Sequence, residues 1–129
     1  EFDYNVVELY RKYQKKLKTG NSVDFDDLLI LPIRLFKNYP NVLNDYQDRY
    51  KYILIDEYQD TNEAQYTFSK LLAAKYRNIF VVGDNDQAIY AFRGANYKNI
   101  LNFEKDFPGT KIIKLDLVSS SERLLLCTD

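Results

Sequence analysis

The first third of the chain has the apolar periodicity of amphipathic helices. From residue 4 to about residue 47, apolar side chains recur every three or four positions, first at Val6, Tyr10, Tyr13 and Leu17. The lysines and arginines of residues 11–18 fall mostly on other faces of this first predicted helix. Gly20 and Asn21 are predicted to end it.

A second helix is predicted directly after this break. Ser22 and Asp24 supply cap-type oxygens, and Asp26 and Asp27 supply negative charge for the first turn. The apolar positions of this helix are Phe25, Leu28, Leu29, Ile33 and Phe36. Pro32 is expected to kink or divide it, and a short polar helix follows Tyr39–Pro40.

The rest of the chain alternates short apolar runs with helical patterns. The β-branched runs "YILI" (52–55), "IFVVG" (79–83) and "KIIKL" (111–115) predict three strands. Residues 62–76 and 95–106, which lie between these runs, have helical patterns. This order predicts an α/β fold with a parallel sheet and right-handed crossovers, preceded by a helical segment.

Composition narrows the class of protein. At 129 residues, of which 46% are hydrophobic, the chain has the length of one domain and can bury a core. The formal net charge of -1 argues neither for nor against a polyanionic partner. One cysteine excludes an intrachain disulfide framework, and the lack of histidine excludes the usual zinc sites and histidine-dependent triads.

The apolar runs and the two ends of the sequence indicate where the protein is expected to reside. No apolar run approaches the ~20 residues that span a bilayer, and the N-terminus does not resemble a signal peptide. We therefore expect a soluble protein in a reduced, intracellular setting. Because the chain begins at Glu1 without a methionine and ends soon after an apolar run, we expect it to be a piece of a longer protein.

Acidic residues follow two of the predicted strands at their carboxyl ends. Asp56 and Glu57 follow the first strand, and residues 83–87, "GDNDQ", follow the second. Open parallel sheets bind ligands beyond these strand ends. There, one carboxylate can hold Mg²⁺ beside a nucleotide and another can take a proton from water. The pattern indicates a nucleotide hydrolase, although an isolated acidic pair can also simply cap the next helix.

Three stretches carry a resemblance to a known family. "ILIDEYQDTNEAQY" (53–66) resembles the Walker B motif of the superfamily 1 DNA helicases of the UvrD, PcrA and Rep type. "VVGDNDQAIYAFRGA" (81–95) resembles the next motif of those enzymes, and "DFDDLL" (24–29) is similar to a third signature. The spacing between the stretches also fits, and the resemblance extends from about Tyr4 to Leu125.

The resemblance implies part of an ATP-dependent 3′-to-5′ DNA helicase. Residues 49–129 would be the C-terminal half of a RecA-like P-loop NTPase domain, and residues 1–48 the end of an inserted helical subdomain. The implied cofactor is Mg²⁺ with ATP. The implied partners are single-stranded DNA, duplex junctions and the remaining motor domains of the same protein, with no membrane. A cytoplasmic location and a part in DNA repair are also implied.

Roles carry over from the family to matching positions. Asp56 would bind the Mg²⁺ of MgATP, Glu57 would orient and deprotonate the hydrolytic water, and Gln87 would sense the γ-phosphate. Coupling to the ATP state would involve Gln59, Asp60 and Asp84, with Gln59 and Asp60 bracing the neighbouring motif rather than touching substrate.

Three further residues would face single-stranded DNA, namely Tyr90, Phe92 and Arg93. Phe92 stands where relatives often carry tryptophan. Aromatic rings stack on any base and arginine pairs with phosphate, which gives a sequence-tolerant grip. The alternative is that these aromatic side chains are ordinary core. "DFDDLL" is either a capped structural helix or a DNA contact, and the basic helix of residues 8–18 is either a solvated face or a DNA contact.

Two departures from the family matter. The phosphate-binding loop GxxxxGK[ST] is absent from this sequence, so the chain by itself is expected to be inactive. After "KIIKLDL", relatives usually read Asn-Tyr-Arg-Ser, whereas this chain has Ser120 at the arginine position. The serine reflects either altered chemistry or a divergent end. Two functions stay open: a helicase fragment, or a non-catalytic DNA- or protein-binding module with a degenerate motor fold.

Overall fold

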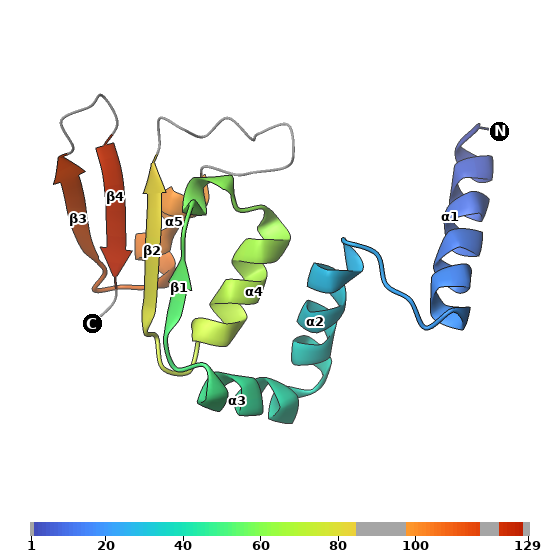
Figure 1. Cartoon of the computed structure of the whole chain (residues 1–129), viewed down its shortest axis with the longest axis horizontal. Helices are drawn as coiled ribbons and strands as arrows, with labels where there is room; N and C mark the ends of the chain where they lie inside the picture. The colour runs from blue at the N-terminus through green and yellow to red at the C-terminus, as the bar shows by residue number, and fades with distance from the viewer. Residues whose placement is uncertain (1, 85–97, 117–121, 128–129) are drawn as a thin grey trace.

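The chain builds a four-stranded sheet, with helices packed against one face (Figure 1). The computed structural model describes residues 2–84, 98–116 and 122–127. The helices are α1 (Phe2–Thr19), α2 (Asp27–Asn38), α3 (Pro40–Arg49), α4 (Glu63–Ala73) and α5 (Lys98–Asp106). The strands are β1 (Ile53–Ile55), β2 (Ile79–Asp84), β3 (Lys111–Asp116) and β4 (Glu122–Cys127), and a 3-10 turn, η1 (Tyr58–Asp60), joins β1 to α4.

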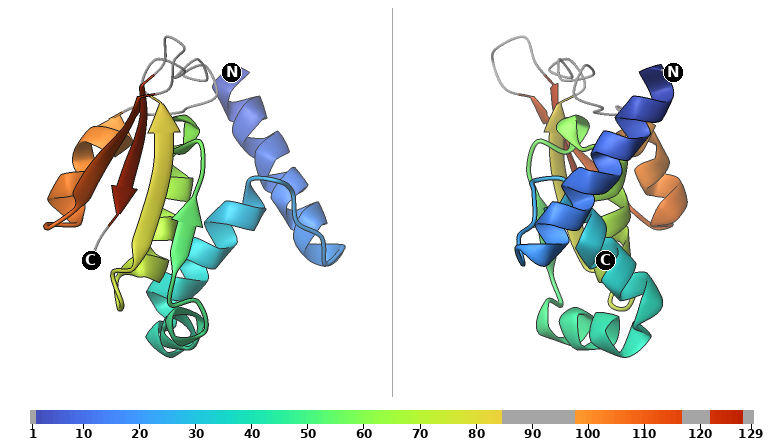
Figure 2. Two further views of the ribbon diagram at one scale, coloured as in Figure 1. Left: turned by 60° about the vertical axis from the view of Figure 1, so that its left-hand side comes forward. Right: turned by 90° about the vertical axis from the view of Figure 1, so that its right-hand side faces the viewer.

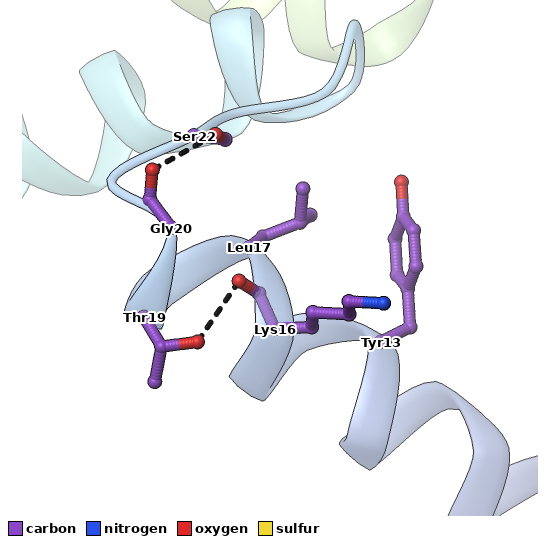
Figure 3. Close-up of a pocket in the computed structure, with 6 residues that line it drawn as sticks. All are labelled: Tyr13, Lys16, Leu17, Thr19, Gly20 and Ser22. Carbon is purple, nitrogen blue, oxygen red and sulfur yellow. Dashed lines mark hydrogen bonds between the residues drawn. The ribbon is translucent and has the colours of Figure 1, made fainter.

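Helix α1 ends where the sequence predicted, in a hydrogen-bonded turn that a left-handed residue closes. Asn21 takes φ 46°. The Ser22 N–H donates to the Leu17 carbonyl at 3.0 Å, and the Asn21 N–H to the Lys18 carbonyl at 3.3 Å. This pair of bonds is the Schellman arrangement, which satisfies carbonyls that the helix leaves open. Figure 3 shows the same turn, with the Ser22 hydroxyl donating to the Gly20 carbonyl.

One of the two residues predicted to supply cap oxygens bonds to the start of helix α2. The Asp27 N–H donates to Asp24 Oδ1 at 2.9 Å, whereas the Ser22 side chain bonds back to Gly20. Of the two, only Asp24 therefore bonds to the start of α2, while Asp26, at the N-cap position, forms no side-chain cap bond. The helix runs unbroken through Pro32, so Pro32 does not divide it, and the alternative of a kink at Pro32 stays a prediction. Helix α3 begins with Pro40 in its first turn, where the missing N–H has no helical partner to lose.

The predicted parallel sheet is wrong, because the sheet is mixed. Its order is β1-β2-β4-β3; β1 and β2 are parallel, while β4 runs antiparallel to both β2 and β3. The three predicted strands do share one direction, but the unpredicted β4 lies between β2 and β3. Only residues 117–121 separate β3 from β4, and parallel neighbours need a crossover of a dozen or more residues. So short a connection permits only antiparallel pairing.

The core lies between one face of the sheet and helices α4 and α5 (Figure 2). Ile79 and Val81 point into it from alternate positions of β2 and are 2% and 1% exposed. Phe103 of α5 and Phe107, the residue directly after that helix, pack there with ring centroids 4.9 Å apart. Burying each of these four side chains contributes about 1.5–3 kcal/mol to the free energy of folding. On the other face of the sheet, Leu54 remains 74% exposed.

The N-terminal helices differ in how they meet this body. Phe36 of α2 is buried and stacks on Phe68 of α4 at 5.8 Å, which fixes α2 against the sheet-bearing part. Helix α1 stands apart from the sheet and its helices in Figure 1, and its apolar positions Val6 and Tyr10 are 50% and 61% exposed. In the described residues, no helix has both the length and the apolar character to cross a membrane.

Candidate functional site

The predicted acidic pair lies at the carboxyl end of β1, beside the end of β2. Register pairs Ile55 with Val81, so the two strands run side by side toward the same edge, as the acidic clusters predicted. Strand β1 is an edge strand in this sheet. Asp56 and Glu57 are both exposed, and Asp56 Oδ1 accepts the Glu57 N–H at 2.9 Å.

Glu57 has an unusual backbone for its residue type. Its φ of 51° and ψ of 44° lie in the left-handed region, which suits glycine and asparagine better than glutamate. Such a conformation costs of the order of 1 kcal/mol and persists when neighbouring contacts impose it. It turns the chain sharply out of β1, and η1 begins at the next residue, Tyr58.

Gln59 joins the two strand ends by hydrogen bonds. Its side chain is 1% exposed; Nε2 donates to Glu57 Oε2 at 2.7 Å, and Oε1 accepts the Asp84 N–H at 2.9 Å. Asp84 itself is 2% exposed. A buried amide that uses both ends in this way fixes one rotamer and one orientation. Gln59 therefore holds the Glu57 carboxylate in place relative to the last residue of β2.

Asp60 lies close to the same carboxylate. Burial, together with the negative charge of Glu57, raises the pKa of Asp60 above its ordinary value. Asp60 Oδ1 is buried and has no hydrogen-bond partner in the described part of the chain. The backbone around it is well anchored, because the Asp60 N–H donates to the Glu57 carbonyl at 2.9 Å.

A cavity of about 500 Å³ opens between β1 and α4. Asp56, Glu57 and Asp60 line one part of it, and Ile53, Phe68 and Leu72 line another. Carboxylate oxygens beside an apolar wall give a cavity that can hold a polar reacting group against a hydrophobic surface.

The donors at this cavity suit a hard divalent cation. Mg²⁺ takes oxygen ligands, and in nucleotide sites it is held by one or two carboxylates together with substrate phosphates. Asp56 and Glu57 offer such oxygens at an exposed strand end. The residues that the structure describes contain no group of three or more acidic, histidine or cysteine side chains arranged to hold a metal.

Several predicted site residues lie outside the described residues. These are Gln87, Tyr90, Phe92 and Arg93, together with Ser120. The structure thus brings together Asp56, Glu57, Gln59, Asp60 and Asp84 from the predicted set.

Two features of the site escaped sequence reasoning. The left-handed backbone of Glu57 has no signal in the sequence, because glutamate rarely adopts it. The start of α4, by contrast, does have a signal in the sequence. Asn62 Oδ1 accepts the Gln65 N–H, and Gln65 Oε1 accepts the Asn62 N–H, both at 2.9 Å. The spacing Asn-x-x-Gln before an apolar run is a variant of the capping box.

The family of the chain follows from comparison with known proteins. The sequence model described as "UvrD/REP helicase N-terminal domain" matches residues 1–108. The chain belongs to the UvrD/REP helicase family, of superfamily 1, as its motifs indicated. Because the matched unit is an N-terminal domain and the sheet is mixed, the prediction of a C-terminal half of a RecA-like parallel-sheet domain is wrong.

Similar curated proteins carry one name. The chain is 54% identical over 115 residues to "ATP-dependent DNA helicase PcrA" of Leuconostoc citreum, covering 89% of this chain and 15% of that protein. It is 50% identical over 121 residues to the protein of the same name from Staphylococcus aureus (strain NCTC 8325 / PS 47), covering 94% and 17%. For the Bacillus subtilis (strain 168) protein the identity is 49% over 125 residues, covering 97% and 17%. The chain thus spans about a sixth of the length of these relatives.

Proposed function

We propose that the chain is part of an ATP-dependent DNA helicase that couples ATP hydrolysis to 3′-to-5′ movement along single-stranded DNA and to duplex unwinding. The observation that carries this proposal is the hydrogen-bond chain from Glu57 through the buried Gln59 to Asp84, which holds a carboxylate at the ends of two neighbouring strands. The name of the relatives, ATP-dependent DNA helicase, supports it.

In this proposal the exposed acidic pair performs the hydrolysis. Asp56 would hold Mg²⁺ directly or through water, and a bound ion would supply positive charge beside the phosphates of ATP. Glu57 orients the attacking water and takes its proton, and the amide of Gln59 keeps the Glu57 carboxylate at a fixed angle to the strand ends. Gln87 senses the γ-phosphate.

The coupling residues connect this chemistry to DNA. Gln59, Asp60 and Asp84 link the end of β1 to the end of β2, and the chain continues from Asp84 directly into the motif with Gln87. A change at the phosphate can thus be transmitted along a continuous segment. Single-stranded DNA is gripped by stacking and phosphate pairing through Tyr90, Phe92 and Arg93.

The domain assignment belongs to the same proposal. Residues 1–48 are the end of an inserted helical subdomain, and residues 49–129 belong to the ATPase motor domain. We infer a cytoplasmic location, since the relatives are named as DNA helicases. Duplex junctions and the remaining motor domains are the proposed partners, and a part in DNA repair stays a prediction.

The test is Glu57→Gln in the full-length protein, with Glu63→Gln as a matched control. Both substitutions remove one carboxylate with little change of shape, but Glu63 is exposed in the first turn of α4 and does not line the cavity. Loss of a general base lowers turnover by about 10² to 10⁴-fold. We expect DNA-stimulated ATP hydrolysis to fall by that factor in Glu57→Gln, with ATP still bound, and to persist in Glu63→Gln.

Two outcomes would contradict the proposal. Equal turnover in the two variants would remove Glu57 from the chemistry. A full-length protein that neither binds nor hydrolyses ATP would favour the non-catalytic binding module instead.

A further inference from the structure

The short turn η1 contacts the elements on both sides of residues 85–97. These residues, on which the predicted DNA-facing side chains fall, follow Asp84 of β2 and precede α5 in the sequence. On the first side, the buried amide of Gln59 accepts the Asp84 N–H at 2.9 Å. On the second side, Phe103 of α5 packs against Tyr58. Because Tyr58 and Gln59 are adjacent residues of η1, one turn holds both β2 and α5.

The contact between Tyr58 and Phe103 is direct and excludes water. The two residues are 1% and 0% exposed, their ring centroids lie 5.7 Å apart, and the ring planes meet at 84°. This edge-to-face arrangement is a preferred one, because the positive edge of one ring meets the negative face of the other. Close packing around both rings means that neither can move alone without opening a void. A displacement of α5 therefore displaces η1 as well.

The end of α5 is held near the same tyrosine. Burial, followed by the negative charge of Asp106, raises the pKa of the Tyr58 hydroxyl above its ordinary value, which places the two groups near each other. Asp106 Oδ1 in turn accepts a hydrogen bond from the Lys70 ammonium of α4 at 2.5 Å. Phe103 and Asp106 are three positions apart and so share one face of α5. That face of α5 is the one that meets η1.

The turn that receives this contact also holds the proposed general base. Glu57 directly precedes η1 and has the left-handed φ of 51°. Its carboxylate accepts a hydrogen bond from Gln59 Nε2 at 2.7 Å, and its carbonyl accepts one from the Asp60 N–H at 2.9 Å. A shift of η1 would therefore carry the Glu57 carboxylate with it. A misplacement of about 1 Å can change the rate of an enzymatic reaction by about 10²-fold.

We propose that Phe103 is a positioning residue that couples the binding of single-stranded DNA to the binding of ATP, by holding α5 against Tyr58. DNA binding acts on α5, and the ring contact passes the displacement to η1 and to the Glu57 carboxylate. Bound nucleotide acts along the same contact in the opposite direction, because coupling between two binding sites is reciprocal. The inference rests on the proposed function, since it takes ATP and single-stranded DNA as the two ligands.

The experiment measures this coupling in the full-length protein. The dissociation constant for a fluorescent single strand of thymidines is measured by anisotropy, with and without Mg²⁺ and a non-hydrolysable ATP analogue. We call the ratio of the two constants the coupling factor. The test variant is Phe103→Leu, which keeps an apolar side chain but removes the ring. The matched control is Phe107→Leu, the same change in the same core at a ring that pairs, among the described rings, with Phe103 but not with Tyr58.

We expect Phe103→Leu to bring the coupling factor down by about 5-fold or more, or to one if the unmodified factor is smaller than that. Its affinity for DNA without nucleotide should change little. Phe107→Leu should lose a similar free energy of unfolding in urea, yet keep the coupling factor. Tyr58→Phe removes the hydroxyl but retains the ring, and should keep the coupling factor as well. If Phe103→Leu does not fold, Phe103→Met, which fills more of the space of the ring, serves for the same measurement.

Four results would overturn the inference. The first is an unchanged coupling factor in Phe103→Leu or, where that variant does not fold, in Phe103→Met. The second is an equal loss in Phe107→Leu, which would show a general effect of a weakened core. The third is a loss in Tyr58→Phe, since the hydroxyl rather than the ring would then be responsible. The fourth is an unmodified protein that binds both ligands with a coupling factor of one.

Failure of this inference can be told apart from failure of the proposed function. Turnover in Glu57→Gln and Glu63→Gln decides that function without any change at α5. If Glu57→Gln abolishes ATP hydrolysis while Phe103→Leu keeps the coupling factor, hydrolysis at Glu57 stands and the coupling role of Phe103 alone falls.

Discussion

Gln59 links two parts of the chain that lie 25 positions apart. Its amide uses the donor end on Glu57 and the acceptor end on Asp84, so a single buried side chain orients the proposed base and joins two strand ends. An alanine would remove both partners at once. A glutamate would keep an acceptor for the Asp84 N–H but would place a second negative charge against Glu57.

We predict that Gln59→Ala lowers both stability and turnover. Leaving buried polar groups without their partners costs about 1–3 kcal/mol, measurable as the free energy of unfolding in urea. A carboxylate displaced by about 1 Å loses up to about 10²-fold in rate. In the full-length protein the turnover number for ATP should fall while ATP affinity changes little.

The matched variant Gln59→Glu separates the two effects. It should retain more stability than Gln59→Ala, because the Asp84 N–H keeps an acceptor, yet hydrolyse ATP as poorly, because Glu57 is repelled. Full turnover in Gln59→Glu would mean that the bond from Gln59 to Glu57 does not position the base.

At the scale of elements, Phe36 fixes α2 to α4, and a polar cluster fixes α3 to the turn after α4. The Lys75 ammonium donates to Asp48 Oδ1 and to Asn44 Oδ1, both at 2.6 Å. The Tyr76 hydroxyl donates to the same Asp48 oxygen at 2.6 Å. These bonds join α3 to the turn after α4. The hydrogen bond from Lys75, followed by that from Tyr76, holds the pKa of Asp48 below its ordinary value of 3.8.

The sign of this shift predicts a pH dependence. Because the folded pKa of Asp48 is depressed, its stabilisation is present above the unfolded value of 3.8 and is lost as the pH falls through the folded value. Asp48→Asn should therefore unfold more easily than the unmodified chain near pH 7. The difference should shrink as the pH falls below 3.8.

Urea unfolding at several pH values measures this difference. Asp45→Asn is the control, since Asp45 is also exposed on α3 and accepts no hydrogen bond from a described residue. It should show little effect at either pH. A difference for Asp48→Asn that stayed constant down to strongly acidic pH would show that the charge of Asp48 does not stabilise this junction.

At the scale of the whole molecule, the sequence contains the acidic pair proposed for ATP hydrolysis but not the phosphate-binding loop that this pair would act with. Asp56 and Glu57 occupy the end of an edge strand, and the sequence contains no GxxxxGK[ST] loop to hold the phosphates. Phosphoryl transfer depends mostly on positioning and on charge around the transferred group.

We therefore predict that the 129-residue chain by itself hydrolyses no ATP at a measurable rate. A single missing cationic contact to the phosphate can lower the rate by about 10³-fold or more, as arginine fingers show. Phosphate release and isothermal titration with MgATP on the purified chain test this. Micromolar binding, or turnover that Glu57→Gln abolishes, would contradict the prediction.

Most elements could be predicted from the sequence because their signals are local. Helical periodicity, the Asp24 side chain that accepts the Asp27 N–H and the turn at Asn21 all lie within a few residues of the structure that they specify. The β-branched runs likewise placed β1, β2 and β3 to within one or two residues. Strand β4 was not predicted, because its "LLLC" run is not β-branched and stands near the end of the chain.

The sequence by itself determined that carboxylates stand at the ends of two strands, since each follows its apolar run directly. It also determined the family, through motifs whose residues are contiguous. Only the tertiary structure decided that β4 enters the sheet between β2 and β3, that Gln59 bonds to Asp84, and that Phe103 packs against Tyr58. The physical reason is that strand pairing, buried hydrogen bonds and ring contacts connect residues far apart in the chain, and no local pattern records which distant partner each residue meets.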